Sequence, residues 1–169
     1  MDDMQEILED FLVEAFELIE QIDHDLVELE ANPEDLELLN RIFRVAHTVK
    51  GSSSFLNFDV LTKLTHHMED VLNKARHGEL KITPDIMDVV LESVDMMKAL
   101  LRSIRERGND TDAGVSITDI CHRLTAINEK LEGAKNEFDD KYKDKFELIK
   151  KFITQIENKY NYDECPEHV

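Results

Sequence analysis

The chain has 169 residues, with 38 acidic against 20 basic side chains and a formal net charge of −18 at pH 7. This charge argues against binding to nucleic acid or to an anionic membrane, because both need a basic surface. Five Gly, three Pro and no Trp favour an all-helical protein, and no apolar run approaches the roughly 20 residues of a membrane span.

The acidic N-terminus does not begin a secretory signal peptide. Cys121 and Cys165 make no disulfide framework, and Cys121 lies on an apolar helical stripe, where a buried free thiol is expected. Cys165 and His168 have the spacing of half a metal site, but no second half is present. We therefore predict a cytoplasmic protein with no membrane insertion and no metal site.

A first helix is predicted over residues 3–30, where apolar side chains recur at helical spacing. Its stripe consists of Ile7, Phe11, Ala15, Leu18, Ile22, Leu26 and Leu29. Asn32 is the expected N-cap of the second helix and Pro33 fits its first turn. This second helix runs to about Leu56 and contains His47.

Asp59 is the expected cap of a third helix over residues 60–77, which ends at Gly78. Thr83 and Pro84 form a cap and first turn for a fourth helix over 84–106. A polar loop over 108–115 follows.

Ser116 and Asp119 then form a variant capping box that opens a fifth helix, which ends at about Glu132. A polar break is predicted over residues 133–137, and the chain is expected to fray from Asn161. Between them lies a sixth amphipathic stripe, formed by Phe138, Tyr142, Phe146, Ile149, Phe152, Ile153, Ile156 and Tyr160.

Short links between helices of this length make neighbouring helices antiparallel. We predict an all-α fold: an antiparallel up-down four-helix bundle with a fifth helix and an additional C-terminal amphipathic helix. The bundle domain spans residues 1–134, and residues 135–169 hold the C-terminal helix and tail. That last helix could pack on the bundle, begin a linker or pair with another chain.

The second helix has a polar cluster around His47, which lies at the edge of its apolar stripe. Arg44 and Lys50 lie three residues to either side, on the same face of the helix. Gly51 and Ser54 follow, and a Gly inside a helix costs about 1 kcal/mol relative to Ala. We interpret Gly51 as a site of access, where a phosphate and another protein can approach His47.

On the third helix, His66 and Glu69 share a face, and both lie at about the same distance from the turn at Asn57 as His47 does. Helix geometry therefore places them level with His47. Glu69 is the candidate that accepts a hydrogen bond from the imidazole and leaves the other ring nitrogen free. His67 and Asp70 are expected to face solvent.

A metal site is the alternative for His47, His66 and Glu69. The adjacent His66 and His67 point about 100° apart on a helix, and two helices do not each supply the Glu-x-x-His pair of a bundle metal site. The sequence also lacks a Gly-rich phosphate loop and an Asp-rich magnesium site, so we expect no ATP binding by this chain itself.

The run from His47 to Ser52, His-Thr-Val-Lys-Gly-Ser, is followed by Phe-Leu-Asn-Phe at 55–58. Together they resemble the motif of the histidine-phosphotransfer (HPt) family, and more narrowly the N-terminal phosphoacceptor domain of the chemotaxis histidine kinase CheA. The resemblance extends from about Ile7 to about Leu131. The family usually has Gly at the position of Asn57, and Asn is the next-best residue for a left-handed cap.

The resemblance implies a four-helix bundle with one added helix, with His47 as the phosphoacceptor and Lys50, His66 and Glu69 as its polar neighbours. It also implies two partners: a kinase catalytic domain, which holds ATP and Mg²⁺, and a chemotaxis response regulator. We expect the regulator to dock on the surface formed by Arg44, Gly51 and Ser54 around His47.

On this interpretation the chain is a substrate domain of a protein histidine kinase and has no cofactor of its own. We expect a monomer, because nothing in the chain resembles the dimerisation helices of the family. Two alternatives remain open at this point: a free-standing phosphorelay carrier, and a helical adaptor that binds partners without phosphotransfer.

Overall fold

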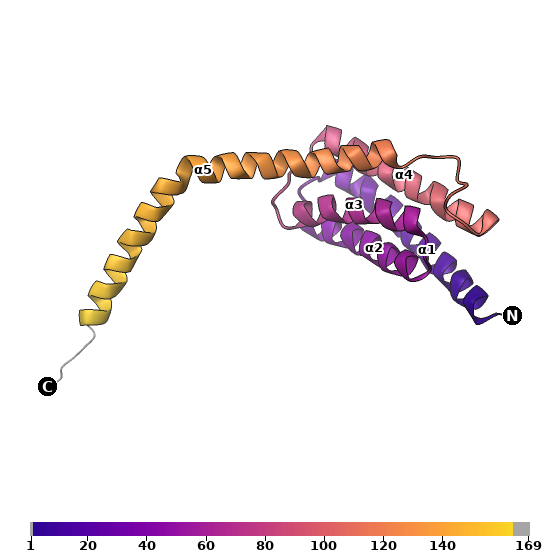
Figure 1. Ribbon diagram of the computed structural model, residues 1–169, viewed down its shortest axis with the longest axis horizontal. Coiled ribbons are helices and arrows are strands. Elements are labelled where there is room, and N and C mark those ends of the chain that lie inside the picture. The colour runs from indigo at the N-terminus through magenta and orange to yellow at the C-terminus, as the bar shows by residue number, and fades with distance from the viewer. Residues whose placement is uncertain (1, 164–169) are drawn as a thin grey trace. The chain divides into compact units, whose positions relative to one another are not determined.

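The computed structural model describes residues 2–163, which form five helices and no strand (Figure 1). The all-α prediction is therefore confirmed. The pair Cys165 and His168 lies outside the described residues. The helices are α1 (Asp3–Ala31), α2 (Leu36–Phe55), α3 (Asp59–Arg76), α4 (Pro84–Arg107) and α5 (Thr118–Asp163).

The first four helices form the predicted bundle. α1 packs on α2 and α4, and α3 packs on the same two helices, which closes a four-sided arrangement (Figure 1). The apolar stripes meet in one core, in which Ile22, Leu39, Leu64 and Leu101 are at most 1% exposed. Burial of each such side chain stabilises the fold by about 1.5–3 kcal/mol. The apolar stripes therefore hold the four helices together.

The start of α2 differs from the sequence prediction. Asn32 closes α1, because its N–H donates to the carbonyl oxygens of Glu28 and Leu29. The N-cap of α2 is Asp35, whose Oδ1 accepts from the N–H groups of Glu37 at 3.0 Å and Leu38 at 3.2 Å. The prediction of Asn32 as the cap was wrong because its peptide group is already committed to the preceding helix.

The turn between α2 and α3 is a Schellman motif. Asn57 has φ of +63°, its N–H donates to the Ser54 carbonyl, and the Phe58 N–H donates to the Ser53 carbonyl at 2.9 Å. The predicted left-handed cap at Asn57 is confirmed. With only three residues between the helices, the turn sets the level at which α2 and α3 face each other.

The cap of α3 comes from a distant residue. Phe58 occupies the N-cap position and has no side-chain hydrogen bond to the helix, so the prediction of Asp59 as the cap was wrong. Instead Asp110, which is 6% exposed in the loop after α4, accepts from the Leu61 N–H at 2.9 Å. By contrast, Thr83 caps α4 as predicted, and Pro84 opens that helix.

α5 begins where Ser116 Oγ accepts from the Thr118 N–H at 3.3 Å. The Asp119 carboxylate pairs with Arg123 at 3.0 Å, in contrast to its predicted place in a capping box. The predicted break over 133–137 is also wrong, since α5 continues to Asp163, beyond the predicted fraying point as well. Gly133 is one weak helix former among Ala, Lys and Glu, and no Pro interrupts the helix.

The chain divides into two compact units, Met1–Glu129 and Lys130–Val169. In the first unit, the start of α5 buries Ile120, Cys121 and Leu124. In the second, the α5 stripe is exposed, with Phe152 at 63% and Ile149 at 54%. The predicted domain boundary between residues 134 and 135 stays a prediction.

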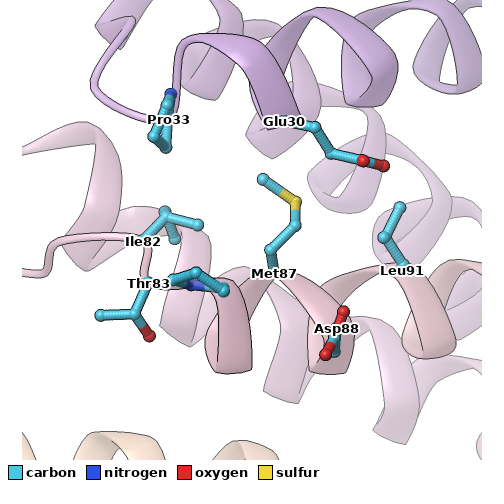
Figure 2. Close-up of a pocket in the computed structure, with 8 residues that line it drawn as sticks. Glu30, Pro33, Ile82, Thr83, Met87, Asp88 and Leu91 are labelled. Atoms are coloured by element: carbon cyan, nitrogen blue, oxygen red, sulfur yellow. The ribbon is translucent and has the colours of Figure 1, made fainter.

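A small pocket lies where the end of α1 meets the start of α4 (Figure 2). Met87 projects from α4 towards Glu30 and Pro33, and Ile82 lies beside it (Figure 2). Met87 and Ile82 are 6% and 3% exposed and form its apolar floor, whereas Glu30, Thr83 and Asp88 at its rim are exposed, so the pocket is a surface depression at the bundle edge. None of the helices in residues 2–163 combines the length and apolar character that crossing a bilayer requires.

Candidate functional site

His47 lies on the outer face of α2, with 62% of its side chain exposed. Its Nδ1 lies 3.0 Å from Oε1 of Glu69 on α3. A carboxylate can only accept a hydrogen bond, so the hydrogen between them belongs to Nδ1. The neutral ring then keeps its lone pair on Nε2. The short turn at Asn57 sets α2 and α3 so that His47 and Glu69 lie at the same height. It thereby brings together the pair that sequence spacing predicted.

Lys50 joins this pair through Glu69. Its ammonium lies 2.6 Å from the second carboxylate oxygen, Oε2, and its side chain is 26% exposed. Glu69 itself is 15% exposed, so one half-buried carboxylate spans an imidazole and an ammonium. The sequence placed Lys50 near His47, but it did not show that Glu69 ties the two together.

These contacts control the ionisation of Glu69. Its partial burial alone would raise the pKa of the carboxyl, but the contacts with Lys50 and then with His47 outweigh burial and lower the pKa. Glu69 is therefore a carboxylate throughout the neutral range. A fixed negative charge at Nδ1 is suited to stabilise a ring that becomes positively charged when Nε2 forms a bond.

His47 also has an aromatic contact within α2, with Phe43 one turn earlier in the helix. The Phe43 ring lies nearly parallel to the His47 ring, with 15° between the planes and 5.9 Å between centroids. The guanidinium of Arg76 lies 3.8 Å from the centre of the Phe43 ring. Sequence reasoning missed both residues, although the four-residue step from Phe43 to His47 is a signal for such a contact.

The predicted docking surface is open. Arg44, Gly51 and Ser54 are all exposed on the same side of α2 as His47. A Cβ added at Gly51 would meet nothing within 4 Å, so packing inside this chain does not require Gly there. This is consistent with a position that leaves room for another molecule.

His66 does not join the His47–Glu69–Lys50 cluster. Its Nε2 lies 3.6 Å from Oδ2 of Asp70, one turn further along α3. His66 nevertheless lines a shallow groove beside the cluster, together with Lys50, Gly51 and Ser54. The structure therefore places it at the edge of the candidate docking surface and away from the imidazole of His47.

His67 lies against α5. It is half-buried, and its Nδ1 lies 3.4 Å from the hydroxyl of Thr125, so the expectation that it faces solvent was wrong. Burial, together with the neighbouring His66, lowers the pKa of the His67 imidazole. Asp70 is half-exposed and pairs with His66.

The arrangement suits nucleophilic chemistry at one atom. The exposed Nε2 of His47 has a free lone pair, and Glu69 holds the opposite side of the ring. Among residues 2–163, no three His, Cys, Asp or Glu side chains gather as ligands for a metal ion.

Residues 6–105 match the family described as the Hpt domain. The chain belongs to the Hpt family. The Hpt motif that the sequence suggested, from His47 to Ser52, lies within the matched region.

Two similar proteins place this Hpt domain more narrowly. The sensor histidine kinase CheAY of Helicobacter pylori is 67% identical over 138 residues, which is 80% of this chain and 17% of that protein. The solution structure of the histidine phosphotransfer domain of CheA has a TM-score of 0.66 at 38% identity, covering 73% of this chain and 92% of that one.

A structure of the phosphorylated P1 domain of CheA3 in complex with CheY6 from R. sphaeroides has a TM-score of 0.62. At 20% identity, over 75% of this chain and 96% of that one, it shows a shared fold. The chain is thus a CheA-like Hpt domain. It spans less than a fifth of the length of the curated CheAY relative.

Proposed function

We propose that His47 is the phosphoacceptor of this Hpt domain and that its Nε2 carries the phosphoryl group. The observation that carries the proposal is the contact between His47 Nδ1 and the carboxylate of Glu69, at 3.0 Å. It leaves Nε2 as the free nucleophile, on a side chain that is 62% exposed and open to a large partner.

The donor is a separate kinase catalytic domain that binds ATP and Mg²⁺, and the chain itself contributes no cofactor. The lone pair of Nε2 attacks the γ-phosphorus, and the bond from that phosphorus to the ADP oxygen breaks. The imidazole becomes positively charged while Nδ1 keeps its proton. Glu69 stabilises that charge, and Lys50, next to Glu69, attracts the phosphoryl oxygens.

The acceptor is an aspartate of a response regulator of the chemotaxis type. The N–P bond breaks as the carboxylate oxygen forms its bond to phosphorus, and the imidazole leaves in its neutral form. The solved complex of a related P1 domain with CheY6 supports this choice of partner. Arg44, Gly51 and Ser54 form the surface on which the regulator docks, and His66 borders it.

We further propose that the chain is the phosphoacceptor part of a longer kinase in the cytoplasm. The 67% identity with CheAY supports the proposal that the chain is part of a longer kinase. The buried free thiol of Cys121 is in keeping with a reducing compartment such as the cytoplasm.

The test is phosphorylation in trans. The chain and its His47→Gln variant are incubated with labelled ATP and a CheA kinase core that lacks its own Hpt domain. We expect an acid-labile, base-stable label on the wild type and none on His47→Gln. Adding a chemotaxis response regulator should then remove the label from the chain.

Label on both proteins would place the phosphoacceptor elsewhere, with His66 the next residue to replace. The control is the same kinase core with its native Hpt domain added as a separate protein. If that domain is labelled and neither form of this chain is, the proposal is refuted and a helical binding module remains.

A further inference from the structure

A line of three side chains leads from α3 to the histidine. Arg76, near the end of α3, places its guanidinium 3.8 Å from the centre of the Phe43 ring. Phe43 in turn lies nearly parallel to the His47 ring. A cation over an aromatic face is attracted by the negative π face of the ring, and parallel rings attract each other when offset.

Arg76 is itself held in place from two sides. Its Nε donates to the side-chain oxygen of Asn73 at 2.9 Å, and its Nη1 donates to the side-chain oxygen of Asn40 at 3.3 Å. Asn73 lies on α3 and Asn40 on α2, so the guanidinium connects the two helices that carry Glu69 and His47. The planar guanidinium can satisfy both oxygens while it covers the Phe43 ring.

The histidine needs such support because one hydrogen bond does not fix a ring. The contact with Glu69 fixes Nδ1, but the ring can still swing about that contact. Its side chain is 62% exposed, so water competes for the same hydrogen bond. A flat partner alongside the imidazole restricts the plane of the ring, and with it the direction in which Nε2 points.

We propose that Phe43 and Arg76 are positioning residues for phosphoryl transfer: Arg76 holds Phe43, and Phe43 holds the imidazole of His47 in the plane that directs Nε2 outward. The inference rests on the proposed function of His47. It adds two residues that act through the histidine and do not touch the phosphoryl group.

The first test is the rate of phosphorylation by the CheA kinase core. Arg76→Ala and Phe43→Leu should each lower kcat by about 3- to 10-fold, with KM for the chain unchanged, because they alter the orientation of the ring and leave the docking surface intact. Phe43→Tyr keeps the ring and should retain the wild-type rate. Arg76→Lys keeps the charge and should recover part of it.

The double variant tests whether the two residues act in one line. If Arg76 acts through Phe43, then Arg76→Ala should cause no further loss in the Phe43→Leu background. If the two losses multiply, Arg76 acts independently of Phe43, which would overturn the proposed line of contacts.

The chain offers a matched control. Arg105 on α4 places its guanidinium 4.7 Å from the centre of the Phe16 ring on α1, away from His47. Arg105→Ala and Phe16→Leu remove the same kind of contact and should leave kcat unchanged. If these variants slow phosphorylation as much as the Phe43 pair does, the effect is one of general stability and the inference fails.

A second readout does not depend on phosphorylation. Nitrogen NMR of the His47 ring at about pH 8.5, some two pH units above the ordinary histidine pKa, reports which nitrogen carries the hydrogen. The wild type should hold it on Nδ1, and Arg76→Ala and Phe43→Leu should shift the ring towards a mixture of tautomers.

The possible failures can be told apart. A wild type that takes no label refutes the proposed function of His47. A wild type that is labelled, with both Phe43→Leu and Arg76→Ala labelled at its rate and unchanged in tautomer, refutes the positioning role alone.

Discussion

At the scale of single residues, the site is organised by the carboxylate of Glu69. One of its oxygens accepts from the His47 imidazole and the other faces the Lys50 ammonium at 2.6 Å. The Lys50 ammonium favours the ionised form of the carboxylate, and the carboxylate holds the imidazole hydrogen on Nδ1. A change at any of the three therefore alters the other two.

Replacement of Glu69 should slow phosphorylation of His47 without abolishing it. A hydrogen bond to a charged group is worth roughly 1.5–3 kcal/mol, so Glu69→Ala should reduce the rate by about 10- to 100-fold. Glu69→Gln keeps an acceptor for Nδ1 and should lose less. Asp70→Asn is the control, because its carboxylate pairs with His66. An unchanged rate in Glu69→Ala would show that the imidazole does not depend on this contact.

The lowered pKa of Glu69 makes a prediction about stability and pH. A carboxyl with a lower pKa in the folded protein contributes stability above its ordinary value, and this contribution is lost as the pH falls through the folded value. Wild type should therefore be more stable than Glu69→Gln at pH 7, and the difference should shrink below about pH 4. Urea unfolding of both proteins across this range measures it, and a constant difference would contradict the expected ionisation.

Gly51 provides a test of the docking surface. With nothing within 4 Å of an added Cβ, Gly51→Ala should stabilise α2 by about 0.5–1 kcal/mol. The added methyl should lower the rate of transfer to the regulator by about 5-fold or more, because it intrudes on a packed contact.

Gly133→Ala is the matched control, since Gly133 is also helical with nothing within 4 Å of an added Cβ. It should gain helix stability and leave transfer unchanged. If Gly51→Ala transfers at the wild-type rate, Gly51 is not part of the docking surface.

The contact between His47 and Glu69 could be predicted from the sequence because it depends on backbone geometry alone. Residue counts from the Asn57 turn place the two at one level of neighbouring helices. The contact between Lys50 and Glu69 could not, because it depends on which rotamers the side chains adopt once α2 and α3 are packed. Phe43 with His47 and His66 with Asp70 are four residues apart on one helix, so spacing brings each pair within reach, but it does not show that the two side chains turn towards each other.

At the scale of helices, the start of α3 depends on a residue that is distant in the sequence. The Asn57 turn uses Phe58 as the N-cap residue, which has no side-chain acceptor for the free N–H groups of the first turn. Asp110, 49 positions after Leu61, supplies that acceptor. The loop after α4 thereby stabilises the helix that carries Glu69.

Asp110→Ala should destabilise the protein by about 1–3 kcal/mol, because it leaves a buried N–H of α3 without a partner. Asp110→Asn keeps an oxygen acceptor and should lose less. Asp59→Ala removes the residue that local sequence suggests as the cap, and we expect a change within about 0.5 kcal/mol. Denaturant unfolding compares the three; a larger loss in Asp59→Ala than in Asp110→Ala would contradict this account.

Helix ends were harder to predict than helices. The apolar stripes of α1 to α4 repeat over many residues and identify each helix, whereas each end depends on one or two polar groups whose partners can be distant, as Asp110 shows. The run 133–137 illustrates the opposite error. Its polar side chains suggested a break, but polar residues such as Lys and Glu are good helix formers, and α5 passes through them.

At the scale of the whole molecule, charge is the dominant feature. A formal net charge of −18 on 169 residues creates a negative field that reaches beyond the surface. Near the docking surface, Asp10 and Glu14 of α1 line a groove together with Gly51. Acidic side chains therefore border the proposed docking surface, which favours a partner with a basic patch.

Transfer from phosphorylated His47 to the regulator should therefore slow as salt is added. Screening shortens the reach of charges from about 10 Å at 0.1 M to about 3 Å at 1 M ionic strength, so kcat/KM for transfer should fall steadily over that range. Asp10→Lys and Glu14→Lys should slow transfer at low salt and flatten its salt dependence. Glu30→Lys and Asp88→Lys make the same charge change at the other end of α1 and should have a smaller effect. A rate indifferent to ionic strength, with all four variants at the wild-type value, would show that shape alone brings the regulator to His47.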